Sequence, residues 1–151
     1  MSRNVLIGLT VLALWGFGFQ AALSQSLLLY FERLDPKTID QLLKDNPLDA
    51  DQNIRATFLQ KTERSSLHLV QIRDREDPHI HETHDLFVTL QRGEGVLHIG
   101  EETVEMKKGD SVFIPQGTPH YFVTTGKEPT VALGVFTPPY AGKDSVPANM
   151  P

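Results

Sequence analysis

The chain of 151 residues contains no cysteine. Disulfides, thiolate metal ligands, a cysteine nucleophile and a lipid-anchor cysteine are therefore all excluded. Basic side chains are also scarce: 14 Lys and Arg stand against 19 Asp and Glu, for a net charge of -5, and they form no run. The chain thus has no electrostatic footprint for nucleic acid or for an anionic membrane surface. Its length favours one domain.

The first two dozen residues contain almost no charge. Arg3 precedes a nearly continuous apolar stretch from Val5 to Phe19, and the small residues Ala22 and Ser24 follow. This layout is typical of a secretory signal peptide, and the apolar run is shorter than the roughly 18–20 residues that cross a bilayer. We predict a signal peptide over residues 1–24, with an uncleaved N-terminal membrane anchor and a buried leader helix as alternatives. The expected location is periplasmic or secreted, or else membrane-anchored.

The next segment, residues 25–53, is expected to be a helical N-terminal extension. One short helix is predicted over residues 35–46, because Asp35 is a good N-cap, Pro36 suits the first helical position and Asn46 precedes another proline. An apolar face of this helix would lie on the core. The residues on that face are Ile39, Leu42 and Leu43.

Short segments of alternating apolar residues, separated by glycine-containing turns, follow from Ile54 onward. Many short strands without a helical period predict an all-β sandwich or barrel. We place the barrel at residues 54–140, and a proline-rich C-terminal tail at 141–151 that wraps the barrel or frays. The expected strands are Ile54–Gln60, Ser65–Arg73, Leu86–Leu90, Gly95–Ile99, Thr103–Met106, Ser111–Ile114, His120–Thr125 and Thr130–Phe136.

Four of the six histidines lie in two clusters about forty residues apart. Residues i and i+2 of a strand share a face, so His79 and His81 point the same way. Asp85 lies past a small turn and can return a carboxylate to the same point, and His120 opens a later strand. Three imidazoles and one carboxylate suit a divalent Fe, Mn, Ni, Cu or Zn ion. On a six-coordinate ion they leave positions open for water or substrate.

The two clusters also carry a family pattern. The chain resembles the cupin family, whose motifs are G-x5-H-x-H-x3,4-E-x6-G and G-x5-P-x-G-x2-H-x3-N. The resemblance spans roughly residues 50–140 and implies a double-stranded β-helix, the cupin jelly roll, with a metal ion inside the barrel. The matching residues are His79, His81 and Gly93 for the first motif, and Gly109, Pro115, Gly117 and His120 for the second.

The chain departs from the family pattern at three positions. Arg73 stands at the first glycine, Thr124 at the last asparagine, and the glutamate position falls on Asp85, or on Leu86 if the spacing to the next glycine is kept. A bulge could absorb the extra residue after Asp85. His84 is an alternative ligand, or else a pocket residue near the ion. The predicted metal ligands are His79, His81, Asp85 and His120.

The function that these observations favour is an exported single-domain cupin that holds a divalent metal ion. We expect a small polar organic ligand at the barrel mouth, and the resemblance allows dioxygenase, isomerase, decarboxylase or hydrolase activity. No catalytic residue can be named, because a fold does not fix a function. The alternative is a binding or sensing module without turnover. The expected partners are a small molecule, no nucleic acid, a membrane only through the N-terminal segment, and a second copy of the chain, since cupins often form dimers.

Overall fold

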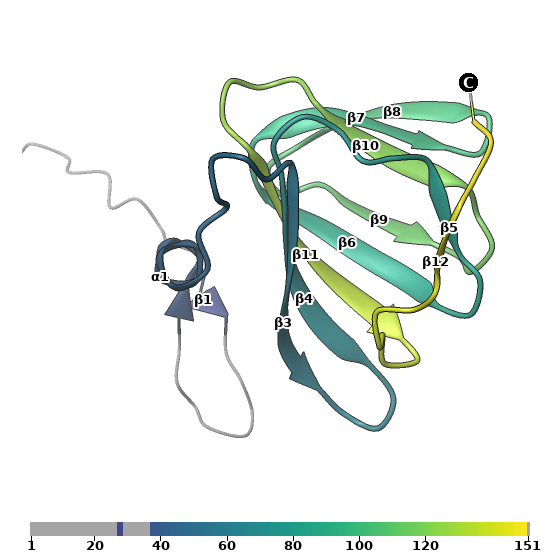
Figure 1. Ribbon diagram of the computed structural model, residues 1–151, viewed down its shortest axis with the longest axis horizontal. Helices are drawn as coiled ribbons and strands as arrows, with labels where there is room; N and C mark the ends of the chain where they lie inside the picture. Colours follow the sequence, from purple (N-terminus) through teal and green to yellow (C-terminus); the bar gives the residue numbers. More distant parts are fainter. Residues whose placement is uncertain (1–26, 29–36, 151) are drawn as a thin grey trace, which may run out of the picture.

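The computed structural model describes residues 27–28 and 37–150, and its main body is a pair of five-stranded antiparallel sheets (Figure 1). Sheet I has the strand order β3–β4–β11–β6–β9, and sheet II has the order β12–β5–β10–β7–β8. Sheet I comprises β3 (Ile54–Lys61), β4 (Ser66–Ile72), β6 (Asp85–Arg92), β9 (Ser111–Ile114) and β11 (Thr130–Thr137). Sheet II comprises β5 (His79–His81), β7 (Glu94–Ile99), β8 (Glu102–Lys107), β10 (His120–Thr124) and β12 (Ser145–Pro147).

Strands that follow one another in the chain mostly alternate between the two sheets, so the chain coils through both of them. This is the double-stranded β-helix that the sequence predicted, and the all-β fold class is confirmed. Each of the eight strands expected from sequence is present, with ends that differ by no more than two residues. The apolar–polar alternation was sufficient to locate them, because each strand has one buried and one outer face.

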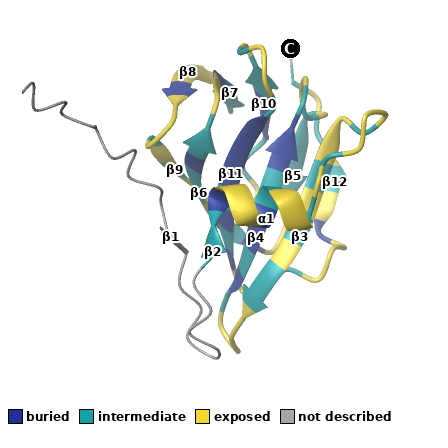
Figure 2. Cartoon of the chain, turned by 90° about the vertical axis from the view of Figure 1, so that its left-hand side faces the viewer, coloured by how far each residue is buried: buried dark blue, intermediate teal, exposed yellow. Residues whose placement is uncertain are grey.

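The main core lies between the sheets and is built from inward side chains of both layers. Figure 2 shows the buried stretches of the strands in dark blue. The Phe122 ring of β10 lies over Gly95 of β7, where a Cβ would lie 2.4 Å from it, so the glycine leaves room for the ring. Removing such side chains from water stabilises the fold by roughly 1.5–3 kcal/mol each. The buried members are Ile72, Leu86, Leu90, Leu97, Met106, Ile114, Phe122, Ala132 and Phe136.

One helix precedes the barrel, as predicted, but it begins later than expected. Helix α1 spans Ile39–Asp45, and a two-stranded ribbon of β1 (Leu27–Leu28) and β2 (Lys37–Thr38) leads into it. Thr38 is the N-cap: its hydroxyl accepts a hydrogen bond from the Gln41 amide at 3.2 Å, and the Gln41 side chain accepts one from the Thr38 amide at 2.8 Å. The prediction of Asp35 as N-cap is therefore wrong, because this reciprocal capping box starts the helix three residues further on.

The buried face of α1 packs on the outer side of sheet I, next to β3 (Figures 1 and 2). Ile39 and Leu42 are buried there against Leu69 of β4 and Val131 of β11. An ion pair between Asp40 and Arg92 of β6 lies at the edge of this contact. The helix thus covers the back of sheet I and leaves the space between the sheets to the barrel strands.

The C-terminal tail is ordered against the barrel and contributes a strand. β12 pairs antiparallel with β5, with Ser145 opposite His81 and Pro147 opposite His79. Two further backbone bonds flank the pairing, from Ala148 N to Pro78 O at 2.9 Å and from Glu82 N to Asp144 O at 3.3 Å. The tail therefore closes the edge of the strand that carries two candidate ligands.

The predicted leader over residues 1–24 lies outside the described residues, so its helix and its cleavage stay predictions. Within residues 27–28 and 37–150, no helix has both the length and the apolar character needed to cross a bilayer.

Candidate metal centre

Three histidines from two neighbouring strands of sheet II meet on its inner side. β5 provides His79 and His81, β10 provides His120, and His120 pairs directly with His79 across the two strands. One ring nitrogen from each lies within 4.8 Å of the others. His81 and His120 are buried and His79 is half-buried. We call these residues the triad; the structure brings together the three histidines that the sequence singled out.

The turn before β10 fixes the position of His120 relative to β5. Gly117 has φ +73°, a backbone angle that side chains with a Cβ resist, and its amide donates to His81 O at 2.7 Å. The amide of Thr118 donates to Pro115 O at 3.2 Å and closes the same turn. The glycine of the second motif thus ties the turn that leads to the third histidine to the strand that carries the first two.

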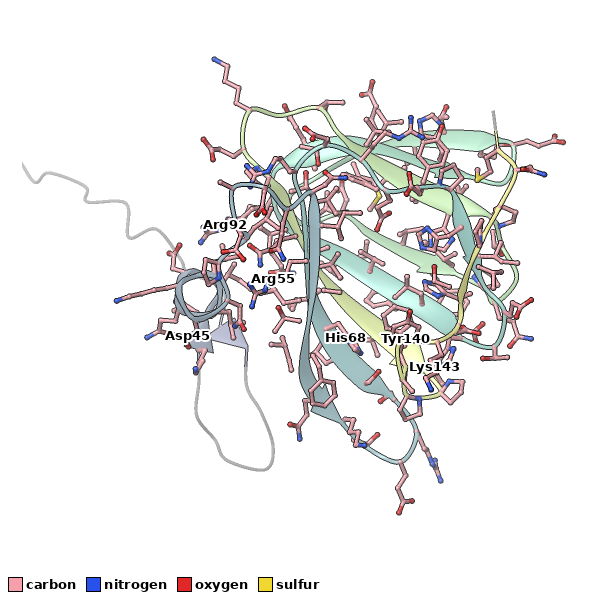
Figure 3. All side chains as sticks on the ribbon, viewed as in Figure 1. Asp45, Arg55, His68, Arg92, Tyr140 and Lys143 are labelled. Atoms are coloured by element: carbon pink, nitrogen blue, oxygen red, sulfur yellow. The ribbon has the colours of Figure 1, made fainter. Side chains whose placement is uncertain are left out.

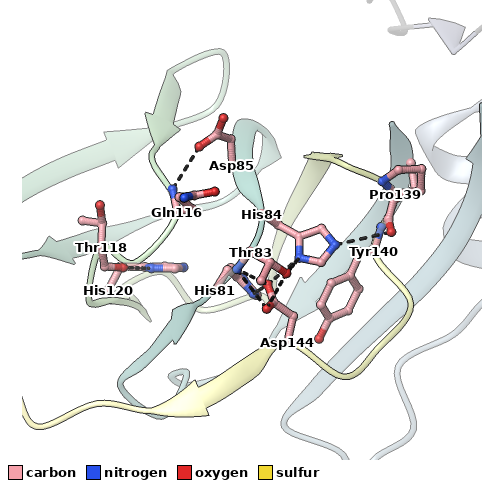
Figure 4. A network of polar contacts seen from close by, with 11 residues as sticks. His81, Thr83, His84, Asp85, Gln116, Thr118, His120, Pro139, Tyr140 and Asp144 are labelled. Atoms are coloured by element: carbon pink, nitrogen blue, oxygen red, sulfur yellow. Dashed lines mark hydrogen bonds and ion pairs between the residues drawn. The ribbon is translucent and has the colours of Figure 1, made fainter. Parts of the chain in front are cut away.

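Backbone carbonyls hold two triad rings in one orientation. His79 Nδ1 lies 2.8 Å from Asp77 O. His120 Nδ1 lies 2.9 Å from Thr118 O, a contact that Figure 4 shows. A carbonyl can only accept, so the neutral imidazole carries its proton on Nδ1 and keeps a lone pair on Nε2. Metal-binding histidines are oriented in this way, with the second ring nitrogen donating to a carbonyl or carboxylate.

The third ring, His81, lacks such a partner. Its Nδ1 is buried without a hydrogen bond among the described residues, and the nearest carboxylate oxygen, Asp144 Oδ2, is 3.9 Å away. Burial, and then the nearby histidines, lower the pKa of His81 to about 4. Burial likewise lowers the pKa of His120 to about 4, against the opposing hydrogen bond to Thr118. Both imidazoles are therefore neutral at physiological pH, the form that binds a metal ion.

The structure does not bring Asp85 into the triad. Asp85 begins β6 on the same face as Phe87, which is 45% exposed, whereas Leu86 points inward and lines the cavity. The Asp85 carboxylate instead accepts a hydrogen bond from the Gln116 amide at 3.0 Å (Figure 4). Successive side chains of a strand point to opposite faces, so Leu86, and not Asp85, occupies the inward position where the family motif has glutamate. Leucine offers no ligand atom.

His84, the alternative ligand, is paired elsewhere. Its Nδ1 forms a close ion pair with Asp144, and the same carboxylate accepts hydrogen bonds from the Thr83 amide at 3.0 Å and the Thr83 hydroxyl at 2.9 Å (Figure 4). Burial alone would raise the pKa of Asp144, but the hydrogen bonds from His84 and Thr83 bring it below its usual range. Sequence reasoning missed Asp144, since it lies in the tail and in neither motif.

A cavity of about 450 Å³ lies between the sheets, and the triad forms part of its wall. Most of the lining is apolar and comes from the inner faces of β4, β6, β9 and β11. Among the described lining residues, the one half-buried carboxylate is Glu76, three residues before His79, which the sequence motifs did not reveal. Burial raises the pKa of Glu76, partly offset by His79 and by a hydrogen bond from the Phe122 amide.

Two further polar side chains line the cavity beside the C-terminal tail. His68 of β4 and Tyr140 have ring centroids 5.9 Å apart (Figure 3). Ser66 joins them, since its hydroxyl lies 2.9 Å from His68 Nε2 and accepts a hydrogen bond from the Tyr140 amide at 2.9 Å. His81 is 5.6 Å from the Tyr140 ring, so this aromatic group borders the triad.

Comparisons with known proteins agree with this fold. Residues 67–136 match the family described as Cupin domain. An uncharacterized protein from Aquifex aeolicus is 37% identical over 119 residues, which cover 79% of this chain and 97% of the relative. The chain belongs to the cupin family.

Two solved structures share the fold at lower identity. One is a Klebsiella pneumoniae protein with a double-stranded β-helix domain, at TM-score 0.62 and 20% identity, covering 72% of this chain and 95% of that one. The other is KdgF from a Halomonas species, at TM-score 0.56 and 22% identity, covering 62% and 86%. At these identities the likeness concerns the fold alone.

Proposed function

We propose that this cupin holds a divalent metal ion through His79, His81 and His120 and binds a small organic ligand in the adjoining cavity. The observation that carries the proposal is the convergence of three ring nitrogens within 4.8 Å of one another at the cavity wall. Two of these imidazoles are held by backbone carbonyls, and the third, His81, keeps a buried nitrogen without a hydrogen bond among the described residues. Buried polar groups of a protein interior are normally hydrogen-bonded, so the unsatisfied nitrogen of His81 needs an explanation.

The donor set fits a borderline ion such as Fe, Mn, Ni, Cu or Zn. His79 and His120 keep their Nε2 lone pairs free because Nδ1 of each faces a carbonyl. His81 retains a buried nitrogen without a hydrogen bond, a cost that ligation of the ring would help to offset. Asp85 is outside this set, so three protein ligands hold the ion. A bound ion supplies Lewis-acid polarisation of a ligand atom, with positions left open for it.

The N-terminal leader motivates the second part of the proposal, that the protein is exported to the periplasm or secreted. An uncleaved leader would instead anchor it to a membrane. Absence of cysteine is compatible with an oxidising compartment, because no disulfide is needed or mis-formed. Fractionation of cells that produce the full chain, with N-terminal sequencing of the product, tests both alternatives: an intact N-terminus in the cytosolic fraction contradicts them.

A non-catalytic binding module is the second candidate, and the apolar cavity lining favours it. Enzyme and module differ in what happens to a ligand that copurifies. Mass spectrometry of the denatured protein identifies such a ligand, and incubation of it with the metal-loaded protein follows. Conversion indicates an enzyme, whereas unchanged ligand at saturating protein indicates a binding module.

Metal content is the direct test of the proposal. Protein purified without chelators, analysed by inductively coupled plasma mass spectrometry, is expected to hold about one divalent ion per chain. His98→Ala serves as the histidine control and should hold as much metal as the wild type. The reason is that His98 stacks on Tyr121, at a centroid distance of 4.2 Å, and is not a member of the triad. Wild-type protein that contains no such ion, and takes up none after exposure to Zn²⁺, Mn²⁺, Fe²⁺, Ni²⁺ or Cu²⁺, defeats the proposal.

A further inference from the structure

The cavity beside the triad is apolar on most of its wall and acidic at one place. Of the lining residues that the structure describes, none is Lys or Arg, while Glu76 and Asp77 are both present. Apart from the triad, the remaining polar members are His68, Thr130, Tyr140 and Ser145. A ligand in this space therefore meets hydrocarbon, neutral polar groups and carboxylates, and no basic side chain.

Glu76 is fixed in place by a two-way backbone and side-chain tie. Its amide donates to Phe122 O at 2.9 Å, and the Phe122 amide donates to Glu76 Oε2 at 3.0 Å. The second carboxylate oxygen, Oε1, accepts no hydrogen bond from the described part of the chain. Glu76 lies three residues before His79, and both residues line the cavity. One acceptor oxygen is thus left available beside the triad.

The composition of the cavity wall determines which ligand groups bind favourably. A half-buried carboxylate with an open lone pair is stabilised by a hydrogen-bond donor, and more so by a cationic one. An ionised Glu76 would repel a ligand carboxylate in the same position, and no Arg or Lys among the described lining residues would offset that repulsion. The apolar walls favour a hydrocarbon or aromatic body over a polyhydroxylated one.

We propose that the cavity selects a small organic molecule with an apolar body and a hydrogen-bond-donating head, an amine or hydroxyl group, that binds Glu76. It discriminates against the matching carboxylic acid. This inference rests on the proposed function, because it names the ligand class of the same cavity. It narrows the expectation of a polar ligand to molecules that are polar at one end only.

Three probes that share one ring and differ in the head group test the selection: benzylamine, benzyl alcohol and benzoate. Dissociation constants are measured by NMR titration of the ¹⁵N-labelled full chain, both metal-free and Zn²⁺-loaded. In metal-free wild-type protein the two donor probes are expected to bind at least about tenfold more tightly than benzoate. The metal-loaded form shows how far a carboxylate's affinity for the ion shifts this ratio.

Glu76→Gln assigns the selection to one side chain. The amide oxygen can still accept from the Phe122 amide, but the group facing the cavity becomes a donor. The ratio of benzoate to benzyl alcohol dissociation constants is expected to fall about tenfold in both metal states, so the contribution of the ion cancels. Glu76→Asp keeps the charge and should retain part of the preference. Glu105→Gln, an exposed change on β8, should leave the ratio unchanged.

The outcomes separate this inference from the proposed function. Equal ratios in wild type and Glu76→Gln, or tightest binding of benzoate to the metal-free wild type, overturn the selection. Absence of binding by all three probes does the same, since a single ring fits easily in about 450 Å³. Metal content is measured on the same samples, and a chain that selects donors without holding an ion would leave the inference standing and remove the metal proposal.

Discussion

Two histidine groups lie next to each other in this barrel and differ in how their polar atoms are satisfied. His84 is paired with Asp144, whose carboxylate also binds Thr83, so this pair forms a closed set of hydrogen bonds. The triad has two rings anchored by backbone carbonyls and one buried nitrogen without a hydrogen bond from the described part of the chain. His81 and His120 of the triad are buried as His84 and Asp144 are, so burial alone does not distinguish the two groups.

This difference indicates that the His84–Asp144 pair has a structural role and that the triad is suited to bind a metal ion. The His84–Asp144 pair stabilises the fold by its own hydrogen bonds, and removal of one member leaves the other buried without its partner. The triad imidazoles would contribute binding free energy only through a metal ion. Without one, three imidazoles close together disfavour protonation of one another. The pair should therefore respond to mutation in stability, and the triad in metal binding. The predictions below contrast these two responses.

The largest effect is expected from removal of a triad member. His120→Ala should weaken binding of Zn²⁺ by more than about 100-fold, because one of three protein ligands is lost. Competition with a chromophoric chelator measures this affinity. His84→Ala is the matched change in the neighbouring pair and should retain most of it. Equal losses of Zn²⁺ affinity in the two variants would contradict the different roles of the triad and the His84–Asp144 pair.

Stability of the metal-free protein should depend on pH through the triad. His81 and His120 have folded-state pKa values near 4, below the ordinary 6.5, so the unfolded chain binds more protons between these limits. The free energy of unfolding should therefore be highest above pH 6.5 and fall as pH drops towards 4, by on the order of 3 kcal/mol per histidine. Urea denaturation across this window measures the slope, and His120→Asn should flatten it; an unchanged slope contradicts the assignment.

Removal of His84 should destabilise the fold rather than the site. His84→Ala leaves the buried Asp144 carboxylate with only Thr83 as a partner, and we expect a loss of about 2 kcal/mol of unfolding free energy. Chemical denaturation of the metal-free protein measures it near neutral pH. His120→Ala, compared under the same conditions, should cost less, since it also relieves crowding of three rings. The reverse ranking would contradict the structural role of the pair.

The smallest effect is expected at Asp85, the residue that the motif spacing favoured as a ligand. Asp85→Asn keeps an oxygen that can accept from the Gln116 amide, so we expect a change of about 0.5 kcal/mol or less in stability and no change in metal stoichiometry. Metal analysis and denaturation both report on it. A loss of bound metal in this variant would return Asp85 to the ligand set.

Much of the fold could be read from the sequence because its signals are local. Strands such as Ser111–Ile114 were located by alternation, and the spacing of His79 and His81 placed both rings on one face. The helix start was misplaced, since Asp35 and Thr38 are both good caps and only the reciprocal bond with Gln41 separates them. Local propensity ranks such alternatives without deciding between them.

The candidate site could be predicted only in part, because some of its members carry no motif. Motif spacing left Asp85 and Leu86 as rivals, and the direction of β6 settled that Leu86 faces inward. Asp144 reaches the site from the tail, through β12. Glu76 lies on the cavity wall because its backbone pairs with Phe122. Nothing in the surrounding sequence marks either carboxylate.

The sequence by itself determined an all-β chain in which three histidines converge. It could do so because apolar–polar alternation and motif spacing are local signals that extend over only a few residues. Only the tertiary structure decided which carboxylates approach them, because that depends on the direction of a strand and on contacts between segments some sixty residues apart. It also decided that the space beside the histidines is mostly apolar and that no Lys or Arg is among its described lining residues, a property that depends on how the two sheets face each other.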